Sequence, residues 1–430
     1  MARKMKDSGI EWIGEIPEGW EIVPVRSCFD EVRTKNTDGQ EQNALQFKSG
    51  NIISKTNFNA SMDDYVADTI TNYTVVLPDT VMINGLNLNY DFKSLRVALV
   101  KEKGVITSAY LAIFPDRKKI FPQYATYLFK GYETKMAFHN MGAGIRKTLG
   151  YKEFKNQPLL LPSEKEQNKI SAYLDSKCSH IDIMLSKIRS SIEEYKKLKQ
   201  TVITQAVTKG VRGEREMKDS GVKWIGEIPK EWVIQKIKSI SSRINVGVVI
   251  RPSEYFDENG TVPFLRGINV KEYLISSDNM VYINESSNHI LSKSQVHTDD
   301  ILIVRDGSIG TSCVVPAEFD GANVVSMVIA TPSISCDSRF ICYSLNSDVG
   351  KTQFTLTKIG SALTHTSVSA VSDIIVAVPS CAEQKEIADY LDAKCAEIDG
   401  LIAKKEQLVK ELESYKKSLI YEVVTGKREV

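Results

Sequence analysis

The sequence predicts an α+β protein in which two globular, mixed α/β domains are joined by two long antiparallel coiled-coil helices. Two observations carry this prediction. Two stretches of the chain recur about two hundred residues further on, and one of them has the heptad pattern of a coiled coil. The inserts between the recurring stretches contain both strand-like and helix-like runs. A duplicated frame with two different inserts therefore defines the fold class.

The duplication is visible as two internal matches. Residues 5–20 match residues 217–232 at twelve of sixteen positions, with an offset of 212. Residues 161–210 align without a gap with residues 378–427 at an offset of 217, with eighteen identities. Because solenoid repeats are much shorter, two copies of this length indicate two domains on a pseudo-twofold frame.

These matches divide the 430 residues into four segments, and this length is enough for more than one core. The segments are residues 1–160, a mixed domain with repeat element 5–20; residues 161–212, a central long helix; residues 213–377, a second mixed domain with repeat element 217–232; and residues 378–430, a C-terminal long helix.

The second recurring stretch is predicted to be helical in both copies, because its apolar side chains recur at alternating steps of three and four. The seam of the helix pair consists of Leu174, Cys178, Ile181, Leu185, Ile188 and Ile192 in the first copy and Leu391, Cys395, Ile398, Ile402, Val409 and Leu412 in the second. Lys199 and Lys416 interrupt the two seams at equivalent places.

Both helices have recognisable start signals. Ser163 and Ser380 are predicted N-caps, and a glutamate three residues later (Glu166 or Glu383) completes a capping box. Each helix is expected to be ~65–70 Å long, at ~1.5 Å per residue.

Stop signals follow at the other end of each helix, where Gly210 and Gly426 are predicted to end it. The apolar seams need partners, which leaves two arrangements. The helices form two separate homodimeric coiled coils, or they pack on each other within one chain as a rigid spacer between the inserts. We favour the internal pair because it avoids the entropic cost of association.

The inserts are predicted to be mixed α/β. Strand-like runs cover residues 73–77, 80–83, 94–100 and 301–304, and helices are expected around residues 122–140 and 338–356. The loop at residues 84–93 is rich in asparagine, whose amide can pair with adenine in the major groove of DNA. The plain alternative is that such loops are solvated turns.

Composition excludes few functions. The net charge of +1 neither requires nor forbids a nucleic-acid partner, because a sum over the chain hides local patches. Seven dispersed cysteines without a Cys-x-x-Cys pair fit free thiols in a reducing cytoplasm and no metal site. The chain has no apolar run that predicts a membrane span or a signal peptide.

No catalytic constellation stands out. Residues 350–352 resemble the end of a phosphate-binding loop, but Leu345 occupies the position where that loop requires glycine. Asp116, Glu133 and Lys135 have the order found in magnesium-dependent nucleases. Glu133 and Lys135 lie in a predicted helix, where residues two apart do not face the same side. We therefore expect no catalytic residues in this chain.

Several motifs together resemble the specificity (S) subunits of type I restriction–modification systems. Residues 12–17 and 224–229, each with a tryptophan shortly after, look like the segments that open each half in that family. The Pro-Ser-x-x-Glu-Gln starts of the long helices and their endings at residues 203–210 and 420–427 are similar to the family's conserved helices. Residues 299–310 are like a strand and turn frequent in its recognition domains.

The resemblance implies a non-catalytic, DNA-binding subunit in the cytoplasm. The two mixed domains would be target recognition domains for double-stranded DNA with a bipartite target. The paired helices would set the spacing between half-sites and bind two modification (M) subunits, which use S-adenosylmethionine to methylate adenine at N6. Two restriction (R) subunits would add cleavage driven by ATP, with magnesium; no cofactor would be bound by this chain.

Candidate DNA contacts are chosen by residue type and loop position. They are Lys48, Asn51, Asn84, Asn87, Lys93, Arg146 and Lys147 in the first domain and Arg251, Arg266, Asn269, Lys271, Arg305, Thr364 and His365 in the second. The first insert, residues 21–160, has 18 basic against 14 acidic residues, whereas residues 233–377 have 11 against 14. Much of the affinity for DNA is therefore expected to come from the assembled complex.

Two other functions remain open at this point. One is a self-contained magnesium-dependent restriction nuclease. The other is a structural protein whose coiled coil holds two protein-binding domains.

Overall fold

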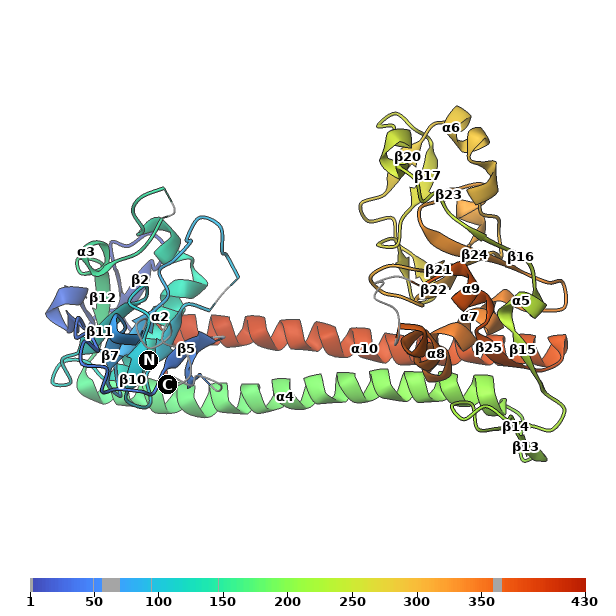
Figure 1. The fold of residues 1–430 in the computed structure, drawn as a ribbon. Coiled ribbons are helices and arrows are strands. Elements are labelled where there is room, and N and C mark those ends of the chain that lie inside the picture. The colour runs from blue at the N-terminus through green and yellow to red at the C-terminus, as the bar shows by residue number, and fades with distance from the viewer. Residues whose placement is uncertain (1–2, 49, 56–69, 94, 146, 359–365) are drawn as a thin grey trace. The chain divides into compact units, whose positions relative to one another are not determined.

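A computed structural model describes residues 3–48, 50–55, 70–93, 95–145, 147–358 and 366–430. The chain divides into two compact units, which we call unit 1 (Met1–Arg189 and Glu406–Val430) and unit 2 (Ser190–Lys405) (Figure 1). Each unit therefore contains one mixed domain and a part of both long helices. The four predicted segments differ from this division, because each long helix packs on both mixed domains along its length.

Unit 1 contains a four-stranded antiparallel sheet in the order β4-β11-β8-β9, together with four two-stranded sheets (β1-β2, β12-β3, β5-β6 and β10-β7). Its strands are β1 (Met5–Asp7), β2 (Glu15–Pro17), β3 (Glu21–Pro24), β4 (Phe29–Glu31), β5 (Leu45–Lys48), β6 (Asn51–Ser54), β7 (Thr74–Val76), β8 (Val81–Ile83), β9 (Val97–Leu99), β10 (Gly104–Ile106), β11 (Leu111–Pro115) and β12 (Pro158–Leu161). Its short helices are η1 (Val25–Ser27), α2 (Pro122–Thr134), η2 (Ala137–Asn140) and α3 (Tyr151–Phe154).

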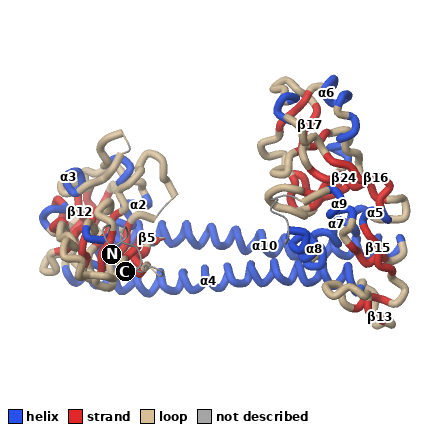
Figure 2. The backbone as a smooth tube through the Cα atoms, viewed as in Figure 1, coloured by secondary structure: helices blue, strands red, loops and turns tan. Residues whose placement is uncertain are grey.

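Unit 2 contains a four-stranded sheet in the order β16-β24-β21-β22, a three-stranded sheet (β20-β17-β23) and three two-stranded sheets (β13-β14, β15-β25 and β18-β19) (Figure 2). Its strands are β13 (Met217–Asp219), β14 (Glu227–Pro229), β15 (Val233–Lys236), β16 (Ser241–Val246), β17 (Val262–Leu265), β18 (Val270–Lys271), β19 (Leu274–Ile275), β20 (Val281–Ile283), β21 (Ile301–Val304), β22 (Ser312–Val314), β23 (Asn323–Val324), β24 (Met327–Pro332) and β25 (Ile375–Val378). Its short helices are α5 (Ile237–Ile240), η3 (Pro252–Tyr255), α6 (Glu285–Ile290), η4 (Ser292–Ser294), η5 (Ala317–Phe319), α7 (Ser338–Asn346), α8 (Asp348–Lys358) and α9 (Val368–Ser372).

The four-stranded sheets of the two units have the same topology although their sequences barely match. In each sheet the first strand in the chain pairs with the last, the last with the second, and the second with the third, all antiparallel. The strand that follows the opening hairpin also pairs equivalently, with Glu21 opposite Leu161 in unit 1 and Val233 opposite Val378 in unit 2. The duplication therefore extends into the inserts.

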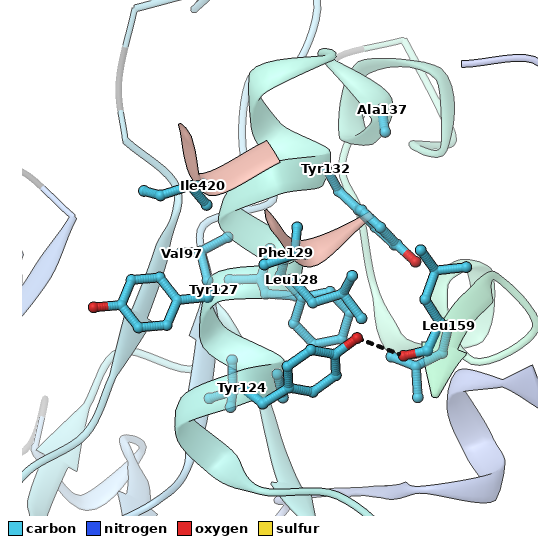
Figure 3. Close-up of a cluster of buried hydrophobic side chains, with 14 of the residues drawn as sticks. Val97, Tyr124, Tyr127, Leu128, Phe129, Tyr132, Ala137, Leu159 and Ile420 are labelled. Carbon is cyan, nitrogen blue, oxygen red and sulfur yellow. Dashed lines mark hydrogen bonds between the residues drawn. The ribbon is translucent and has the colours of Figure 1, made fainter. Parts of the chain in front are cut away.

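A helix buried against the sheet forms the centre of each unit. In unit 1, α2 buries Tyr124, Leu128, Phe129 and Tyr132 against β-strands and against Ile420 of the C-terminal helix (Figure 3). The hydroxyl of Tyr124 donates to the carbonyl of Leu160 at 3.0 Å, the dashed bond of Figure 3. The phenol of such a buried tyrosine needs this acceptor, because an unpaired hydroxyl in the core is costly.

The long helices are α4 (Glu164–Lys209) and α10 (Cys381–Val424). They run antiparallel: in unit 1 Lys416 of α10 pairs with Asp182 of α4, and in unit 2 Lys199 of α4 pairs with Asp399 of α10. The seam residues Leu174, Cys178, Ile181, Leu185, Ile192, Leu391, Cys395 and Ile398 are buried, and Ile188, Ile402, Val409 and Leu412 are partly buried. The helices thus pack on each other within the chain.

Other local predictions can be compared directly with these elements. Gly210 directly follows α4 and Gly426 lies two residues after the end of α10; they adopt left-handed φ angles of 77° and 71°, as helix-ending glycines do. The expected helix at 122–140 is broken, because Met136 adopts a left-handed φ of 52° between α2 and η2. The expected helix at 338–356 is likewise divided at Ser347, which is extended. In the part of the chain that the structure describes, no helix is long and apolar enough to cross a membrane.

Candidate functional site

In unit 1 three segments far apart in the sequence meet at one edge of the domain. They are the β5–β6 turn, the β8–β9 connection (residues 84–93, 95 and 96) and the loop at residues 141–145 and 147–149, and we call the described residues of these segments the loop cluster. The amide of Asn89 donates to the carbonyl of Ile145 at 2.9 Å. The backbone N–H of Leu88 donates to Lys147 at 3.2 Å. Gly50 of the β5–β6 turn lies so close to Leu95 that a Cβ there would meet the Leu95 side chain at 3.0 Å.

A buried arginine holds the β8–β9 connection in shape. Arg96 is only 1% exposed, and its guanidinium donates to the carbonyls of Asn84 and Leu86, both at 2.9 Å. It also donates to the carbonyl of Asp91 and lies 3.6 Å from the carboxylate of that residue. A fixed guanidinium satisfies several carbonyls of an irregular loop at once, and these carbonyls would otherwise lack partners. The connection is therefore preorganised.

Two further polar side chains, Glu133 and His139, contact the backbone of the β8–β9 connection. Glu133, near the end of α2, accepts a hydrogen bond from the backbone N–H of Arg96. Burial raises the pKa of Glu133 to about 7, against the opposing effects of that hydrogen bond and of nearby Lys130. His139 meets the carbonyl of Asp91 at 3.1 Å and stacks on Phe92 with ring centroids 5.1 Å apart.

The outer surface of the loop cluster combines cations, amides and exposed apolar side chains. Lys48, Asn51, Asn87, Lys93 and Lys147 are all exposed. Between them Tyr90, Phe92 and Ile145 are 72%, 57% and 93% exposed. Lysines neutralise phosphates, amides can read base edges, and ring faces can stack on bases. Asn84 is less available, since its side chain accepts the N–H of Leu86 at 3.2 Å.

Unit 2 has an equivalent site at the turn between β21 and β22, residues 305–311. The guanidinium of Arg305 donates to the carbonyl of Thr366 at 2.9 Å, and the N–H of Thr366 donates back to Arg305 at 3.1 Å. The turn is tight because Gly310, with a φ of 89°, lies against Phe354, where a Cβ would come within 2.4 Å of the ring. In both units, then, the connection between the second and third strands of the sheet meets the segment that follows the central helices.

The remaining candidates in unit 2 differ in availability. Asn269 is fully buried; its amide accepts from the N–H of Arg266 at 3.0 Å and donates to Ser276 and Asp278. It fixes the turn beside β18 and is not on the surface, which corrects its assignment as a DNA contact. Arg266 is partly buried and donates to the carbonyl of Asn279.

Lys271 and Arg251 are exposed. Arg251, with a left-handed φ of 43°, precedes η3 and pairs with Glu254 at 3.2 Å. Arg146, Thr364 and His365 lie outside the described residues.

The residues considered for a nuclease do not form a metal site. Asp116 is partly exposed and pairs with Lys119 at 3.2 Å, whereas Glu133 is largely buried and accepts the backbone N–H of Arg96. Lys135 follows the end of α2, and its amine lies 4.6 Å from the ring of Tyr421. Among the described residues no three His, Cys, Asp or Glu side chains are grouped closely enough to hold a metal ion.

Both units contain a joint between the opening hairpin and the start of a long helix that the sequence analysis missed. In unit 1 Arg3 pairs with Glu166 and lies over the ring of Trp20. In unit 2 Arg215 pairs with Glu383 at 2.6 Å and lies over Trp232. Arg3 and Arg215 are themselves 212 residues apart, so extending the first match by two residues would have found them.

A second joint links the central helix of each domain to the long helix. Gln167 accepts the N–H of Phe121 and donates to the carbonyls of Lys119 and Pro162. Gln384 makes the corresponding bonds to Asp337, Ser335 and Pro379. Tyr127 and Tyr343 donate to Asp175 and Asp392, both at 2.8 Å. The identical glutamines and aspartates of the repeat thus anchor the inserts on the frame.

Comparison with known proteins agrees with this architecture. Residues 229–411 match the family model of the type I restriction modification DNA specificity domain. The putative type I restriction enzyme MjaX specificity subunit of Methanocaldococcus jannaschii is 25% identical over 96% of this chain and 95% of its own length. The MjaVIII specificity subunit of the same organism is 24% identical, over 96% and 93%.

Solved structures share the fold. A chain from a study of complex assembly and conformational transition in the type I restriction–modification system superposes with a TM-score of 0.71 at 14% identity, covering 96% of this chain and 99% of that one. The HsdS subunit from Thermoanaerobacter tengcongensis gives a TM-score of 0.51 at 15% identity, covering 99% and 100%.

Proposed function

We propose that this chain is a type I restriction–modification specificity subunit and reads a bipartite DNA sequence, with one half-site per unit. Subunits of this kind work with modification and restriction subunits and with DNA. In this proposal the chain itself performs no chemistry. It determines where on the duplex the catalytic subunits act, in the cytoplasm.

One observation supports the proposal above the others. The two units share the order of a four-stranded sheet, yet the connections at one edge of that sheet differ completely in sequence and length. In both units this edge gathers residues suited to DNA, at the loop cluster of unit 1 and at the turn 305–311 of unit 2. A constant frame with variable loops is the arrangement expected of a protein that reads different sequences with one architecture.

The residues divide into two roles under this proposal. Exposed lysines such as Lys48 and Lys93 would bind phosphates and fix the orientation of the domain on the duplex. Asn87 and the exposed rings beside it would contact bases. In unit 2, Lys271, Arg251 and the outer atoms of Arg305 are the corresponding groups.

The long helices provide the surface for the other subunits in this proposal. Two modification subunits would bind there, carrying S-adenosylmethionine for methylation of adenine at N6. Two restriction subunits would add ATP-dependent, magnesium-dependent cleavage. All cofactors would belong to these partners.

Methylome sequencing tests the proposal. Cells that express the modification subunit with this chain should gain a bipartite N6-methyladenine motif. Replacing residues 21–160 with the corresponding insert of another specificity subunit should change one half of that motif and leave the other half intact. A motif that changes in both halves, or no new methylation in the presence of an active modification subunit, would contradict it.

Single substitutions give a finer test in the complex with the modification subunit. Asn87→Ala should relax selectivity at one half-site by roughly tenfold, the usual cost of a lost base contact. Lys93→Ala should weaken binding to all sequences and lower the salt dependence by about one ion. Lys152→Ala, at an exposed position on α3, serves as the matched control and should change neither.

A further inference from the structure

The long helices carry one kind of ion pair that is identical in both units. Lys199 pairs with Asp399 in unit 2 and Lys416 with Asp182 in unit 1, both at 2.6 Å. The two pairs are copies of each other, because each lysine and each aspartate recurs at the offset of 217. A helix facing a second copy of itself would keep the same pair, with Lys199 opposite Asp182. These pairs align the antiparallel helices but do not distinguish one partner from another.

The buried seam does not distinguish between partners either. Leu174, Cys178 and Ile181 of α4 recur as Leu391, Cys395 and Ile398 of α10. All six side chains are at most 5% exposed. A self-paired helix could therefore bury much the same apolar surface as the internal pair does.

A second kind of ion pair would not be reproduced if one copy of the repeat faced itself, because equivalent positions in the two copies carry opposite charges. Arg189 pairs with Glu413 in unit 1, and Arg212 pairs with Glu386 at 2.8 Å in unit 2. The offset of 217 relates Arg189 to Glu406 and Lys196 to Glu413. It also relates Lys169 to Glu386, whereas Arg212 lies beyond the end of α4 and outside the aligned stretch of residues 161–210. At all three aligned positions the first copy is basic and the second copy is acidic.

This reversal of charge determines with which helix each long helix can pair. Two first halves would place Arg189 opposite Lys196 and Arg212 opposite Lys169. Two second halves would place Glu406 opposite Glu413. By twofold symmetry each like-charge contact would occur twice, whereas in the chain itself Arg189 meets Glu413 and Arg212 meets Glu386.

We infer that these charged positions select the partner of each long helix: the first half accepts a helix with the acidic pattern and rejects a second copy of itself. This inference does not depend on the proposed DNA function. The four residues of the two observed pairs are about half exposed, from 45% to 57%, so a single pair contributes little. Selectivity arises from the difference between attraction and repulsion, added over these positions.

The test uses the full chain with a protease site inserted between Gly213 and Glu214, which are both exposed. The folded protein is cleaved, dissolved in urea and refolded, and the pairs are counted by native mass spectrometry. Random pairing gives two mixed pairs for each pair of either identical kind. We expect the ratio of mixed to identical pairs to be roughly ten times the random ratio at 0.1 M salt, and lower at 1 M, where the Debye length is about 3 Å.

Two sets of substitutions separate charge from other causes. A basic second half carries Glu386→Lys, Glu406→Arg and Glu413→Lys, and should lower the mixed fraction to the random value or below. Adding Arg189→Glu, Lys196→Glu and Arg212→Glu to the first half should restore it. Random pairing of the unmodified halves, or an unchanged mixed fraction with the basic second half, would overturn the inference.

The uncleaved chain provides a second measurement that needs no reassembly. Arg189→Glu should lower the urea midpoint, and adding Glu413→Arg should restore it. Additive effects of the two substitutions would show that the residues are not coupled, and the inference would fail.

Discussion

The two units share the same frame but differ in the strands that their inserts add to the central sheet. Unit 1 adds the β5-β6 and β10-β7 pairs to its four-stranded sheet, whereas unit 2 adds the three-stranded sheet β20-β17-β23 and the pair β18-β19. The strand order of the central sheet and the bonds from the glutamine and the aspartate of each long helix are the same in both. The comparison shows that the contacts between each insert and the long helices are the same in both units, whereas the edge of the central sheet differs between them.

The joints themselves match in geometry but not in environment. The side chains of Arg215 and Glu383 are only 13% and 3% exposed, whereas those of Arg3 and Glu166 are 28% and 32% exposed. A buried charge depends on its partner far more than a solvated one does. Equivalent substitutions in the two units should therefore have unequal effects.

The largest expected effect concerns this joint. Arg215→Ala leaves the carboxylate of Glu383 buried without its main partner and should destabilise unit 2 by about 4 kcal/mol. Arg3→Ala should cost unit 1 less than about 1 kcal/mol, because water can replace the arginine. Hydrogen exchange in β15 and β25 against β3 and β12 measures the two losses separately. Equal losses would show that the burial of the pair is unimportant.

The second expected effect concerns Arg96 of the loop cluster in unit 1 and Arg305 of the turn 305–311 in unit 2, the two edges proposed to contact DNA. Arg96→Met removes the donors to three loop carbonyls and should cost about 3 kcal/mol, with faster amide exchange at residues 84–91. Arg305→Met, which loses one such bond at a partly exposed site, should cost about 1 kcal/mol. In the assembled complex, Arg96→Met should reduce selectivity at one half-site only. A loss at both half-sites would mean that the two edges are not independent.

The third expected effect is a pH dependence confined to unit 1. The pKa of Glu133 is about 7 in the folded protein, above its ordinary value of 4.5, so the folded state holds this proton more tightly. The stability from this group is complete below pH 4.5 and is lost as the pH rises through 7. Unit 2 has Val349 six residues after the matching tyrosine, where unit 1 has Glu133.

Glu133→Gln should therefore remove this loss and make unit 1 more stable than the unsubstituted chain at pH 8, by about 2 kcal/mol. Urea titrations between pH 5 and 8 measure the change. Val349→Gln is the matched control in unit 2 and should leave the slope of stability against pH unaltered. An unaltered slope for Glu133→Gln would mean that the carboxyl does not titrate in this range.

The smallest expected effect tests whether the second joint contributes equally to the stability of the two units. Tyr127→Phe and Tyr343→Phe each remove a hydroxyl that donates to an aspartate at 2.8 Å. Each should cost about 1 kcal/mol, and the double substitution should cost the sum, because the sites lie in separate units. A clear inequality would show that the neighbouring donors Gln123 and Arg339 contribute differently to Asp175 and Asp392.

The sequence predicts the local parts of this fold well. The heptad seam, the helix-ending glycines and the strands at residues 74–76, 81–83 and 301–304 follow from patterns within a few residues. The shared sheet order could not be predicted, because strand pairing depends on distant segments and the inserts lack sequence identity. The sequence gives no sign that Arg96 and Asn269 are buried, since only tertiary packing buries them.

Gln167 and Gln384 have a further consequence for inheritance. Both side chains bind main-chain atoms of the segments that they hold, and main-chain atoms are the same whatever amino acid is present. A gene that acquires a foreign insert by recombination therefore need not acquire matching mutations at the joint. The frame can accept new cassettes in a single genetic event, so that specificity can change faster than point mutation alone would allow.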